Sequence, residues 1–293
     1  MKWKQWTAGA LALLMTVCSA PVAWSADWIT KGGSPHRMSV VTDSQGLFEL
    51  TPYWETQPLG ESAVQPAVID GVVYHLSGDY LWYLDLDKIH PPQVQATAVY
   101  DPAVGLPVPF NRAPGGSFIA PQSSPSYSPE TGILYFGTGY GWLWAYHTRE
   151  RWYQPARLEL GCPIVGSPLV IHDQGRDIVV VADRPNYPGE ESRPEGRPLC
   201  ARTHGKIWVV QGLDDPAGTP RTISYEASTS KSDESGFGGF ITPSAVMAPP
   251  HGNNPSFVIG TDGFEGGRAL RLALDRDNDY RPYRVWTVDS TAG

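Results

Sequence analysis

The chain has 293 residues, a formal net charge of −8 at pH 7 and a sequence pI near 5.3. Such an acidic chain is a poor partner for a phosphate backbone, and no run of lysine and arginine compensates, so we expect no nucleic-acid partner. The length is sufficient to bury a substantial core, in one array more plausibly than in two domains.

Residues 1–25 are predicted to be a secretory signal peptide. Two lysines precede an apolar stretch at residues 8–17, which is too short to span a bilayer comfortably, and small residues then flank a cleavage site before Ala26. Cys18 permits a lipoprotein interpretation, but Val17 before it is bulkier than the usual small residue. We therefore expect an exported mature chain (extracellular, cell-surface or periplasmic) without a transmembrane segment.

Within the mature chain, residues 26–293, four segments share the same order of predicted strands and turns. A Ser/Pro start leads to a short strand, a turn, a denser apolar strand, a Gly/Asp turn, a third strand and a fourth. Such self-similarity indicates repeats that bury their apolar faces only against their neighbours. The predicted repeats lie at approximately 62–100, 123–155, 166–226 and 241–288.

The second and third strands of these repeats are apolar on both faces. VVYHL at 72–76, ILYF at 133–136 and IVVVA at 178–182 do not alternate as a half-solvated sheet would, so both sides of the sheet should be covered. Four-stranded sheets stacked face to face satisfy this requirement, which predicts an all-β β-propeller of about four blades plus an N-terminal strand. A β-sandwich is the alternative, but it should alternate and need not repeat.

The motifs of the first two repeats carry a family resemblance. Residues 66–74 read P-x-V-x-D-G-x-V-Y, Gly78 and Asp79 follow, and residues 81–85 read LWYLD; a related pattern recurs over 125–147. The chain resembles pyrroloquinoline-quinone-like (PQQ-like) repeat propellers over nearly all of its mature length, more weakly in the last two repeats. Because propellers of that family commonly have about seven or eight blades, four blades imply a fragment, an unusual closure or pairing with another chain.

The resemblance does not by itself imply a cofactor. Quinoprotein dehydrogenases of this superfamily carry an adjacent Cys-Cys pair and a calcium-linked set of acids, and this sequence has no adjacent cysteines. We therefore expect a member of a non-catalytic branch with no cofactor. Pyrroloquinoline quinone and calcium belong only to the alternative of a quinone-dependent dehydrogenase or a fragment of one, and a truncated reading frame without independent function is the third interpretation.

Three long segments, at residues 101–122, 184–203 and 227–240, should emerge on one face of a propeller. Long loops gathered on one side of a rigid scaffold are a common place for binding sites, so we predict that this face binds a protein or glycan partner. The candidate ligand-binding residues are Tyr140, Trp142, Arg184, Arg193 and Arg197.

Cys162 and Cys200 would both lie on that face, in an oxidising compartment. A disulfide between them would contribute about 4 kcal/mol by loop-closure arithmetic; two free thiols are the alternative.

The remaining motifs favour structural roles over a metal, nucleotide or stacking site. The histidines are scattered, so we predict no metal site. Residues 275–279 (DRDND) resemble the start of a calcium loop but lack the required glycine, which favours an acidic turn. The G-x-G-x-G of residues 137–141 predicts a tight turn, and tryptophans that recur at Trp82, Trp144 and Trp208 favour packing between blades over a stacking platform.

Overall fold

The structure of the protein is a computed structural model. It describes residues 56–60, 62, 64–88, 94–101, 106–110, 121–150, 152–153, 158–184, 205–226, 244–261 and 268–289. These ranges contain strands and short 3-10 helices, η1 (Leu86–Lys88) and η3 (Arg276–Asn278), but no α-helix. None of their helices is long and apolar enough to cross a membrane. The predicted signal peptide and N-terminal strand lie outside the described residues.

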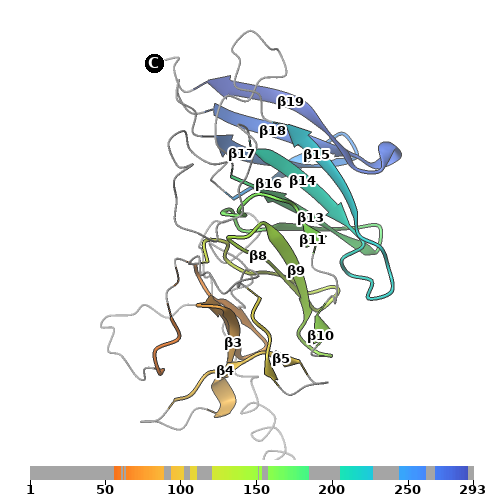
Figure 1. Ribbon diagram of the computed structural model, residues 1–293. Helices are drawn as coiled ribbons and strands as arrows, with labels where there is room; N and C mark the ends of the chain where they lie inside the picture. The colour runs from red at the N-terminus through yellow and green to blue at the C-terminus, as the bar shows by residue number, and fades with distance from the viewer. Residues whose placement is uncertain are drawn as a thin grey trace, which may run out of the picture. The chain divides into compact units, whose positions relative to one another are not determined.

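Four antiparallel sheets follow one another along the chain, and we call them blades 1 to 4 (Figure 1). Blade 1 contains β1 (Ala67–Ile69), β2 (Val72–Ser77), β3 (Tyr80–Asp85) and β4 (Thr97–Ala98). Blade 2 contains β7 (Ser126–Ser128), β8 (Ile133–Gly137), β9 (Trp142–His147), β10 (Trp152–Tyr153) and β11 (Leu158–Glu159), which also pairs with β9. Blade 3 contains β12 (Leu169–Asp173), β13 (Arg176–Ala182), β14 (Lys206–Gln211) and β15 (Arg221–Glu226). Blade 4 contains β16 (Val246–His251), β17 (Asn254–Thr261), β18 (Arg268–Asp275) and β19 (Arg281–Asp289). A small separate sheet pairs β5 (Tyr100–Asp101) with β6 (Leu106–Pro107).

Two hairpins show how the turn residues begin each blade. Asp70 and Gly71 connect β1 to β2 with φ angles of 48° and 74°, and Gln174 and Gly175 connect β12 to β13 with 51° and 77°. Positive φ at both central residues is the geometry of a type I′ turn, which matches the twist of the paired strands. The Asp-Gly and Gln-Gly pairs therefore set the register of these hairpins.

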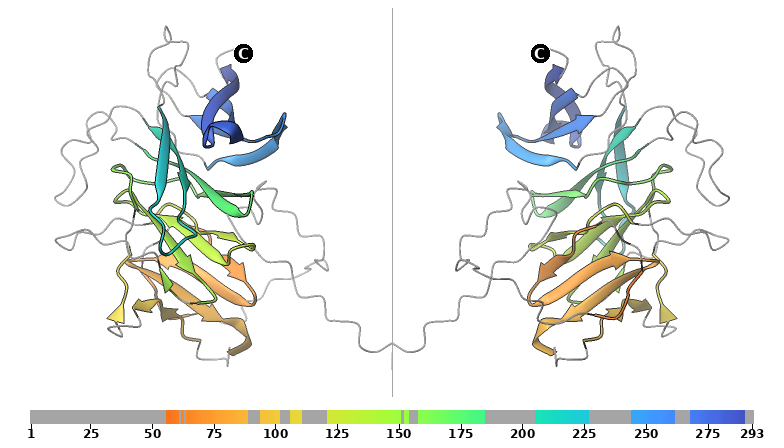
Figure 2. Two further views of the ribbon diagram at one scale, coloured as in Figure 1. Left: turned by 90° about the vertical axis from the view of Figure 1, so that its right-hand side faces the viewer. Right: turned by 90° about the vertical axis from the view of Figure 1, so that its left-hand side faces the viewer.

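Each pair of consecutive blades encloses its own hydrophobic core, and the blades form successive layers in Figure 2. Strand β13 shows why both of its faces are apolar. Val179 and Val181 pack in the core shared with blade 2, whereas Val180 and Ala182 pack in the core shared with blade 4. The prediction of an all-β chain built from four propeller-type blades is confirmed.

The recurring tryptophans occupy the same register position in the third strand of blades 1, 2 and 3. Trp144 is 5% exposed in the core between blades 1 and 2, and Trp208 packs against the core between blades 2 and 3. These two side chains fill the space between blades, as large aromatic side chains in a repeated position are expected to do.

The glycines of the G-x-G-x-G motif are required by close contact with the chain that enters blade 3. A Cβ at Gly137 would lie 2.3 Å from a methyl carbon of Ile164, and one at Gly141, whose φ is +77°, would lie 2.6 Å from the carbonyl oxygen of Cys162. The motif therefore makes a tight turn covered by the connection between blades, and not a nucleotide-binding loop.

A ladder of hydrogen bonds joins the starts of the first strands of all four blades. The backbone N–H of Gln65 donates to Ser124 Oγ at 3.0 Å, and that of Ser124 donates to Ser167 Oγ at 3.2 Å. The N–H of Ser167 then donates to Ser244 Oγ at 2.8 Å. We call this series the serine ladder. Because one contact recurs at equivalent positions, it fixes the same ends of the blades side by side.

Candidate functional site

The strand register of blade 3 places its two long connections at one end of the sheet. Ala182, at the end of β13, pairs with Ile207, and Glu226, at the end of β15, pairs with Lys206 at the start of β14. Residues 185–204 and 227–243 are therefore attached at the same end, where the serine ladder also lies. We call it the loop end, and the opposite end, with the β7–β8, β12–β13 and β18–β19 turns, the turn end.

The two aromatic candidates lie at the loop end but are not exposed. Tyr140 and Trp142 are 3% and 4% exposed, and their ring centroids lie 5.6 Å apart in the core between blades 1 and 2. The two side chains are therefore buried and not exposed at the loop end, and their role in ligand binding stays a prediction. Their apolar rings gain more from packing between blades than from exposure on a glycine-rich turn.

Only part of the predicted cationic site is described. Arg184 is half-buried, and its backbone N–H donates to Pro163 O at 2.8 Å, so its backbone is held at the loop end. Arg193 and Arg197 lie outside the described residues, and their role stays a prediction.

Cys162 is 1% exposed and is disulfide-bonded, but its predicted partner Cys200 lies outside the described residues. The pairing itself therefore also stays a prediction.

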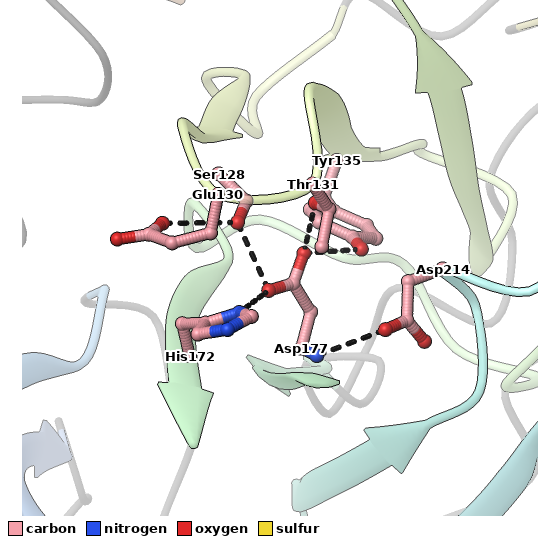
Figure 3. Close-up of polar contacts among 7 residues, drawn as sticks. All are labelled: Ser128, Glu130, Thr131, Tyr135, His172, Asp177 and Asp214. Atoms are coloured by element: carbon pink, nitrogen blue, oxygen red, sulfur yellow. Dashed lines mark hydrogen bonds and ion pairs between the residues drawn. The ribbon is translucent and has the colours of Figure 1, made fainter. Parts of the chain in front are cut away.

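At the turn end, a buried carboxylate joins blades 2 and 3 (Figure 3). Asp177 Oδ1 accepts from Ser128 Oγ at 2.9 Å and lies 2.8 Å from His172 Nδ1. Its Oδ2 accepts from Thr131 Oγ1 at 2.5 Å and from Tyr135 Oη at 2.8 Å. Ser128, Thr131 and Tyr135 belong to blade 2, so the carboxylate of blade 3 holds the first hairpin of its neighbour.

This arrangement occupies the carboxylate completely. A carboxylate has about four lone-pair sites, and four side chains of the protein use them. Ser128 and His172 both contact the same oxygen of Asp177, so the three do not form the serine–histidine–aspartate relay of a hydrolase. Burial, and next the negative charge of Asp177, raises the pKa of Tyr135 well above its usual value, so this hydroxyl stays a donor. The cluster is a polar clamp between blades.

A second clamp joins blades 3 and 4 at the same end. Arg276 donates to Asp173 through Nε at 2.7 Å and Nη2 at 2.6 Å, and Tyr280 Oη donates to the same carboxylate at 2.7 Å. Burial opposes ionisation of Asp173, but the hydrogen bonds from Arg276 and Tyr280 and the charge of Arg276 outweigh it and lower its pKa. Burial and the bond to Asp173 raise the pKa of Tyr280 to about 12.

The acidic turn at residues 275–279 is also used within the protein. Asp275 accepts from the N–H of Asp277 at the start of η3, and Asp279 pairs with Arg221 Nη2 at 2.8 Å. Two of its three carboxylates thus have protein partners. Within the described part of the chain, no group of three His, Cys, Asp or Glu side chains could hold a metal ion.

A cleft of about 360 Å³ opens between blades 1 and 2 at the turn end. Three tyrosines, Tyr74, Tyr83 and Tyr146, line it beside polar side chains that include Asp85 and Thr97. Its volume is in the range of small-molecule sites, and tyrosines with neighbouring hydroxyl and carboxylate groups suit a polar ligand such as a sugar.

Sequence reasoning missed the two clamps and this cleft. Asp173 and Asp177 flank the Gln174–Gly175 turn, so both read as ordinary turn residues, although Asp177 is 1% exposed. The only signal was an acidic residue at the start of a strand whose following residues are all apolar. The partners of Asp173, and three of the four partners of Asp177, come from the next or the preceding blade, which sequence spacing does not reveal.

Comparisons with known proteins bear on the fold. No protein-family model matches this sequence, and no curated protein matches it either. The structure is similar to a europium-containing methanol dehydrogenase, with a TM-score of 0.50 at 13% identity over 90% of this chain and 49% of that one. Quinohemoprotein alcohol dehydrogenases from Pseudomonas putida and Comamonas testosteroni match at TM-scores of 0.49 and 0.46, both at 15% identity over 90% of this chain. This chain spans 40% and 41% of their respective lengths, less than half of each solved relative.

Three acids of the described residues already have protein partners. Protein groups contact both carboxylate oxygens of Asp173 and of Asp177, as shown above, and those of Asp183, which accept from Lys206 N and Trp208 Nε1. These three acids are therefore structural, and we derive no reaction step from them.

Proposed function

We propose that this protein is an exported, non-catalytic propeller scaffold that binds a protein or glycan partner at its loop end. The observation that carries the proposal is that two long connections leave blade 3 at the same end of its sheet. The register attaches residues 185–204 and 227–243 to one end of blade 3, and the serine ladder aligns that end with those of the other blades. Loops on a rigid framework are where binding residues concentrate.

The use of the acids at the turn end supports a non-catalytic role. A general acid or base must reach a substrate proton, and the oxygens of Asp177 are filled by four side chains of the protein. In contrast, the arginines of residues 184–203 carry guanidinium groups that suit carboxylates and sugar hydroxyls.

The test is binding by the full chain to a glycan array, and to proteins captured and identified by mass spectrometry. A variant with Arg184, Arg193 and Arg197 all changed to serine should lose at least roughly 10-fold in affinity, as expected for loss of charge-assisted hydrogen bonds. The matched control changes Arg149 and Arg176, which are exposed at the turn end, to serine and should bind normally.

A further variant separates the loop end from the tyrosine cleft. If Tyr83→Ala abolishes glycan binding and the arginine variant does not, the ligand lies at the turn end and the proposed loop-end site is wrong.

Export has its own test. N-terminal sequencing of the protein recovered from the medium or periplasm should begin at Ala26. Protein retained in the cytoplasm with its first 25 residues intact would contradict export.

A quinone-dependent dehydrogenase, or a fragment of one, is the second candidate, because the solved structures with this fold are named as such enzymes. The full chain would be mixed with pyrroloquinoline quinone and calcium and tested for a bound-cofactor absorbance and for dye reduction with an alcohol. An unchanged spectrum and no dye reduction reject this candidate.

A further inference from the structure

The junctions between consecutive blades differ at the turn end. Blades 2 and 3 are joined there by the Asp177 clamp (Figure 3), and blades 3 and 4 by the Asp173 clamp. Between blades 1 and 2, the same end holds the tyrosine cleft of about 360 Å³. In both clamps a carboxylate accepts a hydrogen bond from a tyrosine hydroxyl, so a comparison of the junctions indicates which ligand chemistry suits the cleft.

The strand register identifies the tyrosine of the first junction that corresponds to the Asp177 clamp. Tyr135, which donates to Asp177, pairs with Ser126, and Tyr74 pairs with Ala67. Ser126 and Ala67 each lie two residues after a position of the serine ladder. Tyr74, which lines the cleft, is therefore the counterpart of Tyr135.

The counterpart of Asp177 has no side chain. Asp177 lies three residues before Val180, which holds the same register position in blade 3 as Tyr135 does in blade 2. The residue three before Tyr135 is Gly132. Its carbonyl oxygen accepts from the N–H and from the Oγ1 of Thr148, both at 3.0 Å, and Thr148 lines the cleft. Blade 2 therefore supplies no carboxylate at this position, and the cleft lies next to it.

The lining of the cleft carries one acid and one base. Asp85 Oδ2 and Lys88 Nζ lie 2.5 Å apart, and the side chains of Lys88 and Asp85 are 77% and 27% exposed. An exposed ion pair contributes little to stability, so its two groups can exchange partners at low cost. A ligand with one ammonium and one carboxylate group keeps both charges paired. A carboxylate alone would face the negative charge of Asp85, and an amine alone would face the positive charge of Lys88.

The remaining lining indicates the size and polarity of the ligand. Val72, Leu84 and Val94 contribute apolar surface, and Tyr83 and Tyr146 contribute aromatic rings. The volume is at the small end of the range for ligand sites. Such a cleft suits a single small molecule with an apolar group, and not a polymer.

We propose that the tyrosine cleft binds a free α-amino acid with an apolar side chain. Its carboxylate takes the part that Asp177 plays in the next junction and accepts from Tyr74 and Lys88, while its ammonium group donates to Asp85. The bound molecule then joins blades 1 and 2 at the turn end, as the clamps join the other blades. This site is separate from the loop end and goes beyond the proposed binding of a protein or glycan partner.

The experiment is a thermal-shift screen of the standard amino acids with the full chain, followed by calorimetric titration of L-leucine and L-phenylalanine. We expect saturable binding to one site per chain, with a Kd below about 1 mM. Two analogues of leucine test the need for both charges: isopentylamine lacks the carboxylate, and isocaproate lacks the ammonium group. Each should bind at least roughly 10-fold more weakly than leucine, because each loses charge-assisted hydrogen bonds.

Matched substitutions test the assigned contacts. Asp85→Asn and Tyr74→Phe should each weaken leucine binding by roughly 10-fold. Their controls are Asp87→Asn, at an exposed position of η1, and Tyr127→Phe, in the core between blades 1 and 2 but outside the cleft lining. Both controls should bind normally. Lys88→Gln should weaken the binding of leucine but strengthen that of isopentylamine, which a site for a simple cation would not show.

The loop-end variant keeps this proposal distinct from the proposed function. The chain with Arg184, Arg193 and Arg197 changed to serine should bind leucine like the wild type, whatever happens to its partner. Hydrogen exchange of the wild type adds a readout without substitutions: the bound amino acid should raise the protection of β2 and β3 more than that of β17.

An absence of saturable binding by every apolar amino acid overturns the proposal. Binding of glucose in their place, or leucine binding that Asp85→Asn leaves unchanged, overturns it as well.

Discussion

At the scale of single residues, Asp177 shows how much one buried carboxylate can organise. Its side chain is fully enclosed, and it takes hydrogen bonds from Ser128, Thr131 and Tyr135 of the preceding blade. A buried charge of this kind is tolerated only when its partners replace the water it has lost.

We predict that Asp177→Asn strongly destabilises the protein. The amide keeps the shape of the side chain but offers one acceptor oxygen and turns two N–H donors toward hydroxyl donors. The free energy of unfolding, measured by denaturant titration, should fall by about 3 kcal/mol. Glu159→Gln, at an exposed position of β11, is the control and should change it by less than about 0.5 kcal/mol. An unchanged stability of Asp177→Asn would show that the clamp contributes little.

The burial and the contacts of single side chains were harder to predict from the sequence than the strands. Tyr140 and Trp142 sit in a glycine-rich turn, which suggested exposure, but the connection through Cys162 and Ile164 passes over that turn and buries them. Which segment covers a turn depends on contacts between repeats. The same reason hid Asp173 and Asp177, because most of their partners belong to other blades.

At the scale of strands and blades, the serine ladder places one hydroxyl acceptor at each junction. We predict that Ser167→Ala lowers the free energy of unfolding by about 1 to 2 kcal/mol, because the N–H of Ser124 then lacks its acceptor in a buried position. Ser224→Ala, at an exposed position of β15, should be nearly neutral in the same denaturant titration. Equal effects of the two substitutions would contradict a role for the ladder.

The Asp173 clamp predicts a dependence of stability on pH. The folded protein lowers the pKa of Asp173 below 3.8, so the ionised form stabilises the fold. This contribution is complete above about pH 4 and is lost as the pH falls through the lowered pKa. Asp173→Asn should therefore cost about 2 kcal/mol at neutral pH and reduce the loss of stability on acidification.

The measurement for this clamp is a set of thermal unfolding curves between neutral and acidic pH. Asp277→Asn, an exposed substitution on the neighbouring turn, is the control and should keep the wild-type pH profile. An Asp173→Asn profile parallel to that of the wild type would contradict the assignment.

Elements were predictable because their signals are local. The Asp-Gly pair at residues 70–71 and the apolar run at 178–182 both depend on neighbours in sequence, and both lie where strands β1–β2 and β13 require them. The assignment of both faces of β13 to cores followed from its lack of alternation. The β11 strand, added to blade 2 beside β10, carries no such signal, because it is two residues long.

At the scale of the whole molecule, stability should vary along the series of blades. Blades 2 and 3 have a described neighbour on both faces, whereas blades 1 and 4 have one each. In repeat arrays, the stability of a unit is approximately the sum of its own term and those of its interfaces. We therefore predict that, in dilute solution, amides of β8, β9, β13 and β14 exchange most slowly and those of β2 and β17–β19 faster. Hydrogen-exchange mass spectrometry measures this, and equal protection in all four blades would contradict it.

The constancy of the serine ladder also has a consequence for how such a gene can change in length. Since each rung links equivalent atoms of consecutive units, duplication or excision of an entire unit leaves every surviving rung with a matching partner. Insertion of a single amino acid immediately before Ser167 would displace two hydrogen bonds of the ladder: the one that Ser167 Oγ accepts from Ser124 and the one that Ser167 N–H donates to Ser244. Natural variants should therefore differ by whole-unit increments, and smaller insertions should be confined to the connections that leave the sheets.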